Sequence, residues 1–579
     1  MKKLLIYLRD YKKESVLGPL FKLLEASFEL IVPLVVASMI DIGITNNDRG
    51  YIIKMCLIMA ALGLIGLICS VTAQYFAAKA AVGFATKLRH GLFSHIQSLS
   101  FSQMDKEGTS TLITRMTSDI NQVQSGVNLV LRLFLRSPFI VFGAMIMAFT
   151  VDVKAALIFV VVIPVLSVIV FGIMLISIPL FKKVQGGLDK VLGVTRENLT
   201  GVRVIRAFGE EEHEIKKFDE ETDHLKHMQV VAGQISALMN PLTYIVINGG
   251  LIVLIYTGAL QVESGILSQG QVVALVNYMS QILVELVKLA NLIITVTKAF
   301  ACGNRIQNIF EIPAGMDTSS APTDSSSLHE ETGTVEFDHV SLRYYQGGEE
   351  ALTDIHFKAK KGATIGVIGG TGSGKSSLVN LIPRFYDVEK GCVKVDGRDV
   401  RQYPLAHLRD KIGIVMQKAV LFKGTIRENL LWGNENASEE ELWEAIKAAQ
   451  AEEFVLQKRD KLDEMIEQEG RNLSGGQKQR LSIARALVKK PEILILDDSS
   501  SALDYATDAA LRKSIKALPG EITVFIVSQR ASSMLHADTI IVLDDGNVAG
   551  MGTHEELLQS CEVYQEIYYS QFERKEGAN

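Results

Sequence analysis

One stretch decides the fold of the second half of this chain: Gly369-Gly370-Thr371-Gly372-Ser373-Gly374-Lys375-Ser376. It matches the pattern G-x-x-x-x-G-K-[ST], in which a glycine-rich loop points backbone amide groups at phosphate oxygens. Residues 363–368 before it read as a buried strand, and residues 375–382 after it read as a helix that Pro383 ends. A strand, a loop and a helix in this order are what a phosphate loop requires. The sequence therefore predicts an α/β domain that binds a phosphate-bearing ligand.

The residues of this loop have distinct expected roles, and they predict an α/β P-loop NTPase domain that binds ATP with Mg²⁺. Lys375 is placed to neutralise the β- and γ-phosphates, and Ser376 to ligate Mg²⁺. The apolar run 493–496 ends at Asp497, which we expect to join the Mg²⁺ shell, because a buried carboxylate without a cation is costly. The predicted nucleotide contacts of this region are Gly369, Gly370, Thr371, Gly372, Ser373, Gly374, Lys375, Ser376, Ser377 and Asp497.

The first half of the 579-residue chain is of a different kind. Up to about residue 300 it consists mostly of long apolar stretches with few charges. Crossing a bilayer takes about 20 apolar residues, and six stretches are long enough. Their approximate limits are 15–42, 52–84, 128–152, 154–181, 232–262 and 270–298. The prediction is a membrane all-α domain of six transmembrane helices ahead of the NTPase domain.

Lysine and arginine residues set the expected orientation. The long connections between the second and third and between the fourth and fifth segments carry many of them, whereas the link at 261–269 carries none. Because basic residues favour the cytoplasmic side, both long loops and both termini are expected there. Residues 1–14 include a basic amphipathic stretch that fits an interfacial elbow helix. We expect an integral, multi-pass protein of a bacterial cytoplasmic membrane, in contact with membrane lipid.

Composition also bounds the domains and the partners. Residues 313–333 are rich in Ser, Thr, Pro and Asp without apolar periodicity, which indicates a linker. The expected order is an elbow helix (1–14), a transmembrane domain with two long cytoplasmic loops (15–312), the linker (313–333) and the NTPase domain (334–579). A net charge of -6 gives no reason to expect nucleic acid as a partner. The five cysteines are scattered and form no C-x-x-C pair, so neither a zinc site nor a disulfide framework is indicated.

A further motif lies between the phosphate loop and Asp497. It reads Leu473-Ser474-Gly475-Gly476-Gln477 and runs directly into an amphipathic stretch, 478–487. With these motifs in this order, the whole chain resembles an ATP-binding cassette (ABC) exporter half, a membrane domain followed by a nucleotide-binding domain. The resemblance implies a head-to-tail dimer in which each ATP is clamped between one chain's phosphate loop and the other chain's signature loop.

Carried over by position, the resemblance implies further site residues. Tyr344 would stack on adenine, with Tyr345 as the alternative register. Gln417 would touch Mg²⁺ and sense the membrane domain, and residues 501–504 would form the D-loop. Residues 101–118 and 202–214 resemble the coupling helices that rest on the nucleotide-binding domains. The signature contacts would come from Ser474, Gly475, Gly476 and Gln477.

Two positions depart from the family pattern, and both would face the γ-phosphate. Asp498 stands where a general-base glutamate is expected, and Gln529 stands where a switch histidine is expected. An aspartate withdraws the carboxylate by roughly 1.5 Å, the length of one C–C bond. Glutamine can donate a hydrogen bond to a phosphate but carries no positive charge. Both changes favour a weakly hydrolytic site, and hence a second, homologous half-transporter with the glutamate and histidine intact. Neutral variation in an active homodimer is the alternative.

Charged residues inside the apolar segments are costly there and mark a cavity or an interhelical pair. They are Glu25, Glu29, Arg132, Arg136, Glu285 and Lys288. Glu285 and Lys288 are three residues apart on one helix and could pair with each other, with Glu285 as the first candidate for cavity lining. The alternative is that some of these charges lie in helix extensions below the bilayer, where charge is ordinary.

The resemblance, with these departures, implies ATP-driven export of amphipathic small molecules of the multidrug type, with Asp498, Gln529 and Gln417 at the hydrolytic centre. Two alternatives stay open. One is a homodimeric lipid or peptide exporter with two equal sites. The other is an ATP-gated channel or sensor, which would tolerate weak hydrolysis.

Overall fold

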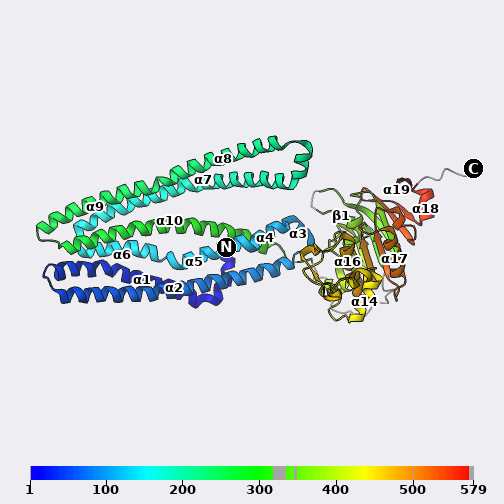
Figure 1. Ribbon diagram of the computed structural model, residues 1–579, viewed down its shortest axis with the longest axis horizontal. Coiled ribbons are helices and arrows are strands. Elements are labelled where there is room, and N and C mark those ends of the chain that lie inside the picture. Colours follow the sequence, from blue (N-terminus) through cyan, green and yellow to red (C-terminus); the bar gives the residue numbers. More distant parts are fainter. Residues whose placement is uncertain (1, 314, 317–333, 345–347, 500, 573–579) are drawn as a thin grey trace, which may run out of the picture. The chain divides into compact units, whose positions relative to one another are not determined.

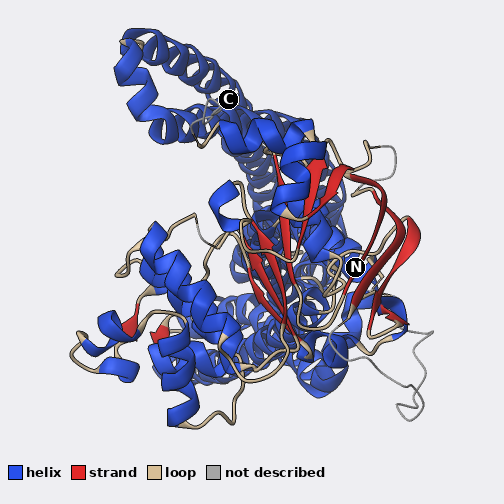
Figure 2. Ribbon diagram, turned by 90° about the vertical axis from the view of Figure 1, so that its right-hand side faces the viewer, coloured by secondary structure: helices blue, strands red, loops and turns tan. Residues whose placement is uncertain are grey.

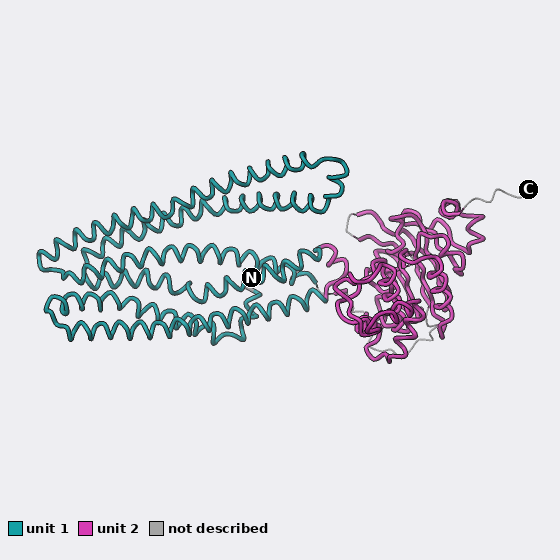
Figure 3. Tube along the Cα trace, in the orientation of Figure 1, with its two compact units in different colours: residues 1–97, 107–313 teal, residues 98–106, 314–579 magenta. Residues whose placement is uncertain are grey.

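The computed structural model describes all residues except 1, 314, 317–333, 345–347, 500 and 573–579. It divides the chain into two compact units (Figure 3): unit 1 comprises residues 1–97 and 107–313, and unit 2 comprises residues 98–106 and 314–579. The linker predicted at 313–333 lies almost wholly outside the described residues. Residues 98–106, which we expected to belong to the membrane domain, instead group with unit 2.

Unit 1 is built of long helices (Figure 1). Its elements are η1 (Lys2–Tyr11), α1 (Lys12–Ser38), η2 (Met39–Ile44), α2 (Arg49–Gln97), α4 (Thr109–Thr114), η3 (Arg115–Asp119), α5 (Ile120–Leu133), α6 (Arg136–Val151), α7 (Val153–Phe208), α8 (Glu211–Ala237), α9 (Met239–Glu263) and α10 (Gln269–Glu311). The elbow region, η1, is a 3-10 helix. Within the described residues, six helical stretches are long and apolar enough to cross a membrane, as predicted.

These helices extend well beyond the apolar segments. α2 continues to Gln97 and α7 to Phe208, past the predicted span ends at 84 and 181. Small residues let them approach closely. Ala73, Ala77 and Ala81 on α2 are at most 1% exposed, and a Cβ on Gly18 of α1 would lie 3.4 Å from the backbone nitrogen of Ala77. The interior of unit 1 is therefore packed through backbone proximity.

One predicted span is not a single helix. The segment 128–152 is interrupted at Phe134–Leu135, where α5 ends and α6 begins. Pro138 explains the break, because it has no N–H to donate and its ring clashes with the carbonyl four residues earlier, that of Phe134. The apolar composition predicted the span, but not its division into two helices.

Unit 2 contains two larger sheets (Figure 2). A four-stranded antiparallel sheet has the order β2-β1-β4-β5, and a six-stranded sheet has the order β12-β11-β3-β10-β9-β6, parallel except for β12. β7 and β8 form a separate pair. The strands are β1 (Val335–Leu342), β2 (Leu352–Ala359), β3 (Thr364–Gly369), β4 (Lys390–Val395), β5 (Arg398–Asp399), β6 (Ile412–Val415), β7 (Gly424–Thr425), β8 (Met465–Ile466), β9 (Ile493–Asp497), β10 (Thr523–Val527), β11 (Thr539–Asp544) and β12 (Asn547–Gly552).

Helices accompany these strands. They are α3 (Phe101–Glu107), α11 (Lys375–Asn380), η4 (Val400–Gln402), α12 (Leu405–Asp410), α13 (Ile426–Leu431), α14 (Glu439–Ala448), α15 (Glu452–Leu456), η5 (Lys461–Asp463), η6 (Gln468–Gly470), α16 (Gly475–Val488), α17 (Tyr505–Lys516), η7 (Ala531–Ser533), α18 (His554–Ser560) and α19 (Glu562–Tyr569). The sheet positions the site, because β3, β10, β9 and β6 are adjacent and parallel. Their carboxyl ends meet at one edge, where ligands of open α/β sheets bind.

Candidate functional site

A cavity of 210 Å³ lies at the carboxyl edge of these four strands. It is lined by Thr371, Gly372, Gly374, Lys375, Ser376, Ser377, Gln417, Asp497, Asp498, Val527, Ser528 and Gln529. The structure thus brings together ten of the sequence-predicted residues from four segments. Gly369, Gly370 and Ser373 belong to the same loop and sit beside the cavity. Tyr344 and the signature residues lie outside its lining.

The geometry of the loop depends on its glycines. A Cβ on Gly369 would fall 2.1 Å from the Leu543 carbonyl oxygen, so no larger residue fits. Gly374 has φ +93°, a left-handed conformation that glycine adopts without strain, and it caps the start of α11. The backbone therefore closes tightly in front of the N-terminus of α11, where amide groups and the helix dipole favour an anion.

Lys375 occupies the centre of the loop. Its ammonium group donates to the carbonyl oxygen of Gly369 at 2.9 Å and to that of Gly370 at 2.5 Å, and the residue is 9% exposed. Burial lowers the pKa of Lys375, and the charges of Asp498 and Asp497 oppose that shift. A buried cation held by neutral carbonyl groups is well placed to attract a phosphate.

Asp497 and Ser376 form the second charged element. The Ser376 hydroxyl donates to Asp497 Oδ1 at 2.9 Å, and Asp497 is 6% exposed. Burial raises the pKa of Asp497, and the neighbouring Asp498 charge adds to that shift. A divalent cation would reverse this penalty. The oxygen donors of Ser376, Asp497 and Gln417 are the type that Mg²⁺ prefers, so the residues present fit the ion.

Asp498 and Gln529 line the same cavity as this pair. Asp498 has φ +46°, a left-handed conformation that aspartate tolerates better than most residues. Its carboxylate accepts from Gln417 Nε2 at 3.4 Å, a long contact. Gln529 follows β10 and its side chain is exposed to the cavity. Both residues that depart from the family pattern therefore line one cavity.

Tyr344 lies next to the phosphate loop. Its hydroxyl donates to Ser377 Oγ at 2.8 Å, and its ring meets that of Tyr386 edge-on, with centroids 5.0 Å apart. Tyr345, the alternative register, falls outside the described residues. Tyr344 is thus an aromatic residue in contact with the end of the phosphate loop, and Tyr386 lies beside it.

The signature segment starts α16 and lies away from the cavity. Ser474 caps the helix: its hydroxyl accepts from Gln477 N at 3.3 Å, while Gln477 Oε1 accepts from Ser474 N at 3.0 Å. Ser474 and Gly475 are exposed. A Cβ on Gly476 would lie 3.1 Å from the carbonyl oxygen of Ala502, within the expected D-loop. An exposed, capped helix N-terminus suits an anion delivered from outside this chain.

Sequence reasoning missed the residues that hold the Gln529 segment. Ser528 lines the cavity and is 1% exposed. Arg530 donates to the carbonyl oxygens of Leu503 at 3.2 Å and Ser501 at 3.1 Å, tying the segment to the D-loop. Gln571, just after α19, donates to the Gln529 carbonyl at 2.8 Å and accepts from Ala531 N at 2.9 Å. No motif marks Gln571, since it lies 42 residues from its partner.

The charged residues of unit 1 form a cluster that joins three helices. Arg136 on α6 donates to Glu285 on α10 at 2.6 Å and to Glu29 on α1 at 2.7 Å. Lys288 pairs with Glu285 at 2.8 Å, as their spacing on one helix allows, and Ser137 adds a bond of 2.8 Å. The Glu285 side chain is 3% exposed. We call Glu29, Arg136, Glu285 and Lys288 the membrane charge cluster.

This cluster borders a cavity of 460 Å³ between α1 and α10. The lining includes apolar residues, such as Val32, Val36 and Val284, beside Glu29, Glu285 and Lys288. Glu285 therefore lines a cavity and takes part in an interhelical pair at the same time. Of the other charges, Glu25 bonds Lys22 at 2.6 Å on the same helix.

The first expected coupling segment, residues 101–118, is divided: 101–106 of the short helix α3 group with unit 2, whereas the remaining residues, which include α4 and most of η3, group with unit 1. The Phe101 and Phe385 rings have centroids 4.6 Å apart, and Tyr386 donates to the Asp105 carboxylate at 2.7 Å. These contacts explain why residues 98–106 group with unit 2. In the second segment, Gly209 ends α7 with φ +69° and α8 begins two residues later.

Comparison with known proteins agrees with this architecture. A family model described as the ABC transporter transmembrane region matches residues 15–286, and one described as ABC transporter matches residues 352–501. YfiB of Bacillus subtilis (strain 168), an uncharacterized ABC transporter ATP-binding protein, is 37% identical over 575 residues, 99% of each chain. YgaD of the same organism, provisionally named a multidrug export ATP-binding/permease protein, is 32% identical over 98% of each chain.

Among solved structures, a bacterial Atm1-family ABC exporter with ATP bound has the same fold. Its TM-score is 0.80 at 22% identity, and the match covers 98% of this chain and 99% of that one. The membrane unit, the ATP-binding unit and the identity over the full length lead to one conclusion. This chain belongs to the ABC transporter family, as an exporter half-transporter whose multi-pass membrane region is coupled to an ATP-hydrolysing domain.

Proposed function

We propose that this chain is the subunit with the degenerate ATP site in a heterodimeric exporter of amphipathic small molecules. The observation that carries the proposal is the pair Asp498 and Gln529, which line one cavity beside the phosphate loop. The second, homologous half-transporter would supply the intact glutamate and histidine. The intact signature residues of this chain would serve the partner's phosphate loop.

The chemistry supports slow hydrolysis at this site. The Asp498 carboxylate is one methylene shorter than a glutamate, a retraction of roughly 1.5 Å. A misplacement of about 1 Å can cost on the order of 100-fold in rate, because attack geometry is demanding. Gln529 offers a hydrogen bond but no positive charge to the γ-phosphate. Two losses at the same reacting group reinforce each other.

ATP binding, by contrast, has its full set of groups. In the proposal, Lys375 neutralises the β- and γ-phosphates, and Ser376, Gln417 and Asp497 hold Mg²⁺, which supplies charge neutralisation when bound. Tyr344 stacks on the adenine. The remaining contacts come from the loop residues Gly369, Gly370, Thr371, Gly372, Ser373, Gly374 and Ser377, and across the dimer from Ser474, Gly475, Gly476 and Gln477.

The substrate class rests on the membrane unit. The cavity between α1 and α10 combines apolar walls with Glu29, Glu285 and Lys288, which suits a molecule that is apolar in part and polar in part. The provisional naming of YgaD for multidrug export points the same way. In this proposal the chain lies in a bacterial cytoplasmic membrane with both termini and both long loops in the cytoplasm.

Purification of this chain with and without a candidate partner half-transporter tests the proposal. The chain alone should hydrolyse ATP far more slowly than the mixed complex, which should reach roughly 1 to 10 turnovers per second. Homodimers that turn over at that rate would disprove the heterodimer. Dye accumulation against a gradient in proteoliposomes separates a pump from a channel or sensor.

Paired variants of the complex sharpen the test. Asp498→Ala or Gln529→Ala should leave most of the ATP turnover, because neither belongs to the principal hydrolytic site. Ser474→Ala should lower turnover by on the order of 10-fold or more, because its hydroxyl would contact the nucleotide at the partner's site. Equal losses from the two sets would contradict the division of labour between the two sites.

A further inference from the structure

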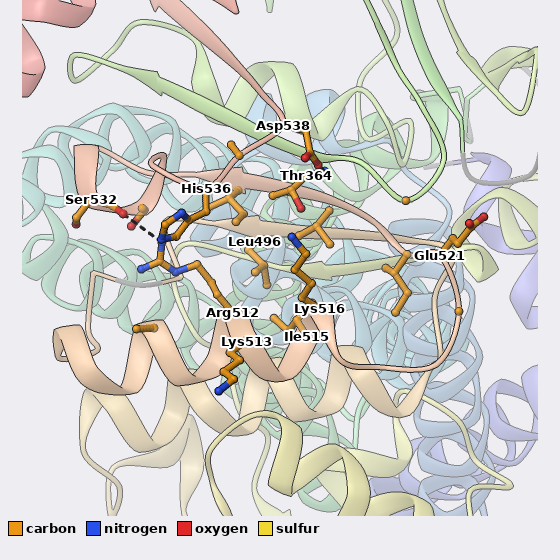
Figure 4. A pocket seen from close by; sticks show the side chains of 18 of the residues that line it. Thr364, Leu496, Arg512, Lys513, Ile515, Lys516, Glu521, Ser532, His536 and Asp538 are labelled. Atoms are coloured by element: carbon orange, nitrogen blue, oxygen red, sulfur yellow. Dashed lines mark hydrogen bonds between the residues drawn. The ribbon is translucent and has the colours of Figure 1, made fainter. Parts of the chain in front are cut away.

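We call the 210 Å³ cavity at the phosphate loop the ATP cavity. A second cavity, of 820 Å³, lies on unit 2 and shares no lining residue with it (Figure 4). Its walls come from α17, the loop around η7 and the starts of β3 and β10. Strands β9 and β10 contribute to both cavities through successive residues. Leu496 and Ile526 face this one, whereas Asp497 and Val527 face the ATP cavity. Since successive strand residues point to opposite faces, the two cavities are separated by the sheet.

The floor of this cavity is apolar. Leu496, Ile515, Val524 and Ile526 line it and are between 3% and 8% exposed. A volume of 820 Å³ falls within the roughly 300–1,000 Å³ that small-molecule sites occupy. The cavity therefore has room for an apolar body of ligand size.

The rim is basic. Lys361, Arg512, Lys513 and Lys516 line the cavity against the acidic pair Glu521 and Asp538. Four of these six charges have local partners. Lys361 pairs with Glu521 at 3.4 Å, and Asp538 accepts from Thr364 N at 2.7 Å. Arg512 is bound to Asp508 at 2.6 Å.

Lys516 differs from these residues. It has no ion-pair partner among the described residues, and its side chain points toward Leu496 and Thr364 inside the cavity (Figure 4). Lys513 has no such partner either, but its side chain points away from the cavity (Figure 4). Lys516 thus supplies an unbalanced positive charge over an apolar floor, and Lys513 is its natural control.

A buried hydroxyl adds a second, independent observation. Ser533 lines the cavity and is 2% exposed, yet its Oγ has no hydrogen-bond partner within the described part of the chain. A buried hydroxyl without a partner costs about 1–3 kcal/mol. A polar ligand atom in the cavity would remove that penalty.

We propose that this cavity binds a small amphipathic organic anion, with its apolar body on Leu496, Val524 and Ile526 and its acid group at Lys516. Ser533 offers a further hydrogen bond to the ligand. Neither the phosphate loop nor the membrane cavity takes part. The proposal is thus independent of which compounds are exported and of whether the partner is a second, different chain.

Photolabelling of the full-length transporter in lipid nanodiscs tests this site. The probe is 4-benzoylbenzoate, an aromatic carboxylate, and its neutral amide is the control for partition into lipid. Peptide mapping should place cross-links of the carboxylate within residues 496–538, above the level of the amide. Equal labelling by acid and amide, or cross-links confined to other segments, would overturn the proposal.

Single-residue variants test which lysine binds the acid group of the probe. Lys516→Gln should lower labelling by the carboxylate roughly two- to fivefold, the effect of one exposed charge contact, and leave labelling by the amide unchanged. Lys513→Gln should leave both unchanged. Ser533→Ala, which removes only the hydroxyl, should lower labelling while preserving ATP binding at the other face of the sheet. If Lys513→Gln and Lys516→Gln lose labelling equally, the acid group is not held inside the cavity.

Discussion

The ATP cavity and the membrane charge cluster both concentrate charge in buried places, but they treat it differently. In the membrane charge cluster, Arg136, Glu285 and Lys288 satisfy one another at 2.6–2.8 Å. In the ATP cavity, Lys375 donates only to carbonyl and hydroxyl oxygens, and the Gln417–Asp498 contact is long, at 3.4 Å. Charged residues that form ion pairs with one another hold helices together. Charges that lack a counter-ion of their own are available to a ligand.

The largest effect should come from breaking the membrane charge cluster. Arg136→Ala removes the buried cation that pairs with Glu285, leaves that carboxylate with Lys288 and Ser137, and should destabilise unit 1 by about 3–5 kcal/mol. The measurement is thermal unfolding of the purified transporter in detergent. Arg132→Ala is the matched control, since Arg132 lies four residues earlier, near the end of α5, and has no ion pair among the described residues.

A double replacement separates structure from transport. Arg136→Met with Glu285→Leu exchanges the pair for apolar side chains, which is often neutral for buried ion pairs. If the cluster only holds helices together, stability returns and substrate transport is retained. If stability returns and transport is lost, the cluster also contacts substrate.

The next largest effect should follow Lys375→Ala. ATP binding to this chain should fall by on the order of 100-fold, because the one buried cation of the phosphate loop is removed. Photolabelling of this chain by 8-azido-ATP measures the loss. Lys394→Ala is the control: Glu336 and Asp338 raise the pKa of Lys394 and satisfy it on β1 and β4, far from any role in nucleotide binding. If both variants lost ATP photolabelling to a similar extent, the distinction between a lysine that binds the ligand and a lysine held in structural ion pairs would be wrong.

A smaller effect is expected for Gln571→Ala. Its two hydrogen bonds fix the backbone on either side of Arg530, and each is worth about 0.5–1.5 kcal/mol. Without these bonds the backbone at Gln529 is less fixed, and its side chain should contact the γ-phosphate less well. The ratio of ATP affinity to ADP affinity of this chain should therefore fall by up to about tenfold, while ADP affinity stays constant. Isothermal titration with both nucleotides gives the ratio. Gln565→Ala, on α19 six residues before Gln571 but bonded to the Leu558 carbonyl, should leave the ratio unchanged.

The smallest effect concerns pH. Burial lowers the pKa of His554, whose Nδ1 lies 2.8 Å from the Tyr564 hydroxyl. Because the pKa of His554 is lower in the folded state than the value of about 6.5 in the unfolded state, the unfolded state binds more protons than the folded state between these two pKa values. The stabilising contribution is therefore complete above about pH 6.5 and is lost as pH falls toward the folded pKa. The Tm of unit 2 should drop between pH 7 and pH 5 by more than in His554→Gln; identical pH profiles would rule this out.

The sequence predicted the lining of the ATP cavity well because these groups lie at the carboxyl end of a strand or within two residues after it. Gln417, Asp497 and Gln529 come after β6, within β9 and after β10, and parallel strands bring their carboxyl ends together. Local pattern and sheet topology were then sufficient to assemble the cavity. The exporter architecture and the six spans were confirmed in the same way, since apolar length is a local property.

The partners of the buried charges were not predictable in this way. Arg136 and Glu285 are 149 residues apart, and helical periodicity defines a face without naming the helix that covers it. The same holds for Gln571 beside Gln529. The break at Phe134 was locally readable from Pro138, but the apolar composition around it concealed the signal.

The membrane charge cluster also imposes an order on biosynthesis. Arg136 leaves the ribosome 149 residues before Glu285, which is about 7–30 s at a synthesis rate of roughly 5–20 residues per second. During that interval, Glu29 on α1 is already made and is the acidic partner available to Arg136. We infer that the Glu29–Arg136 ion pair forms first and neutralises the arginine until α10 has been synthesised and inserted. Cross-linking of stalled nascent chains that end before residue 285 would detect this α1–α6 intermediate, and its absence would show that the two helices wait apart.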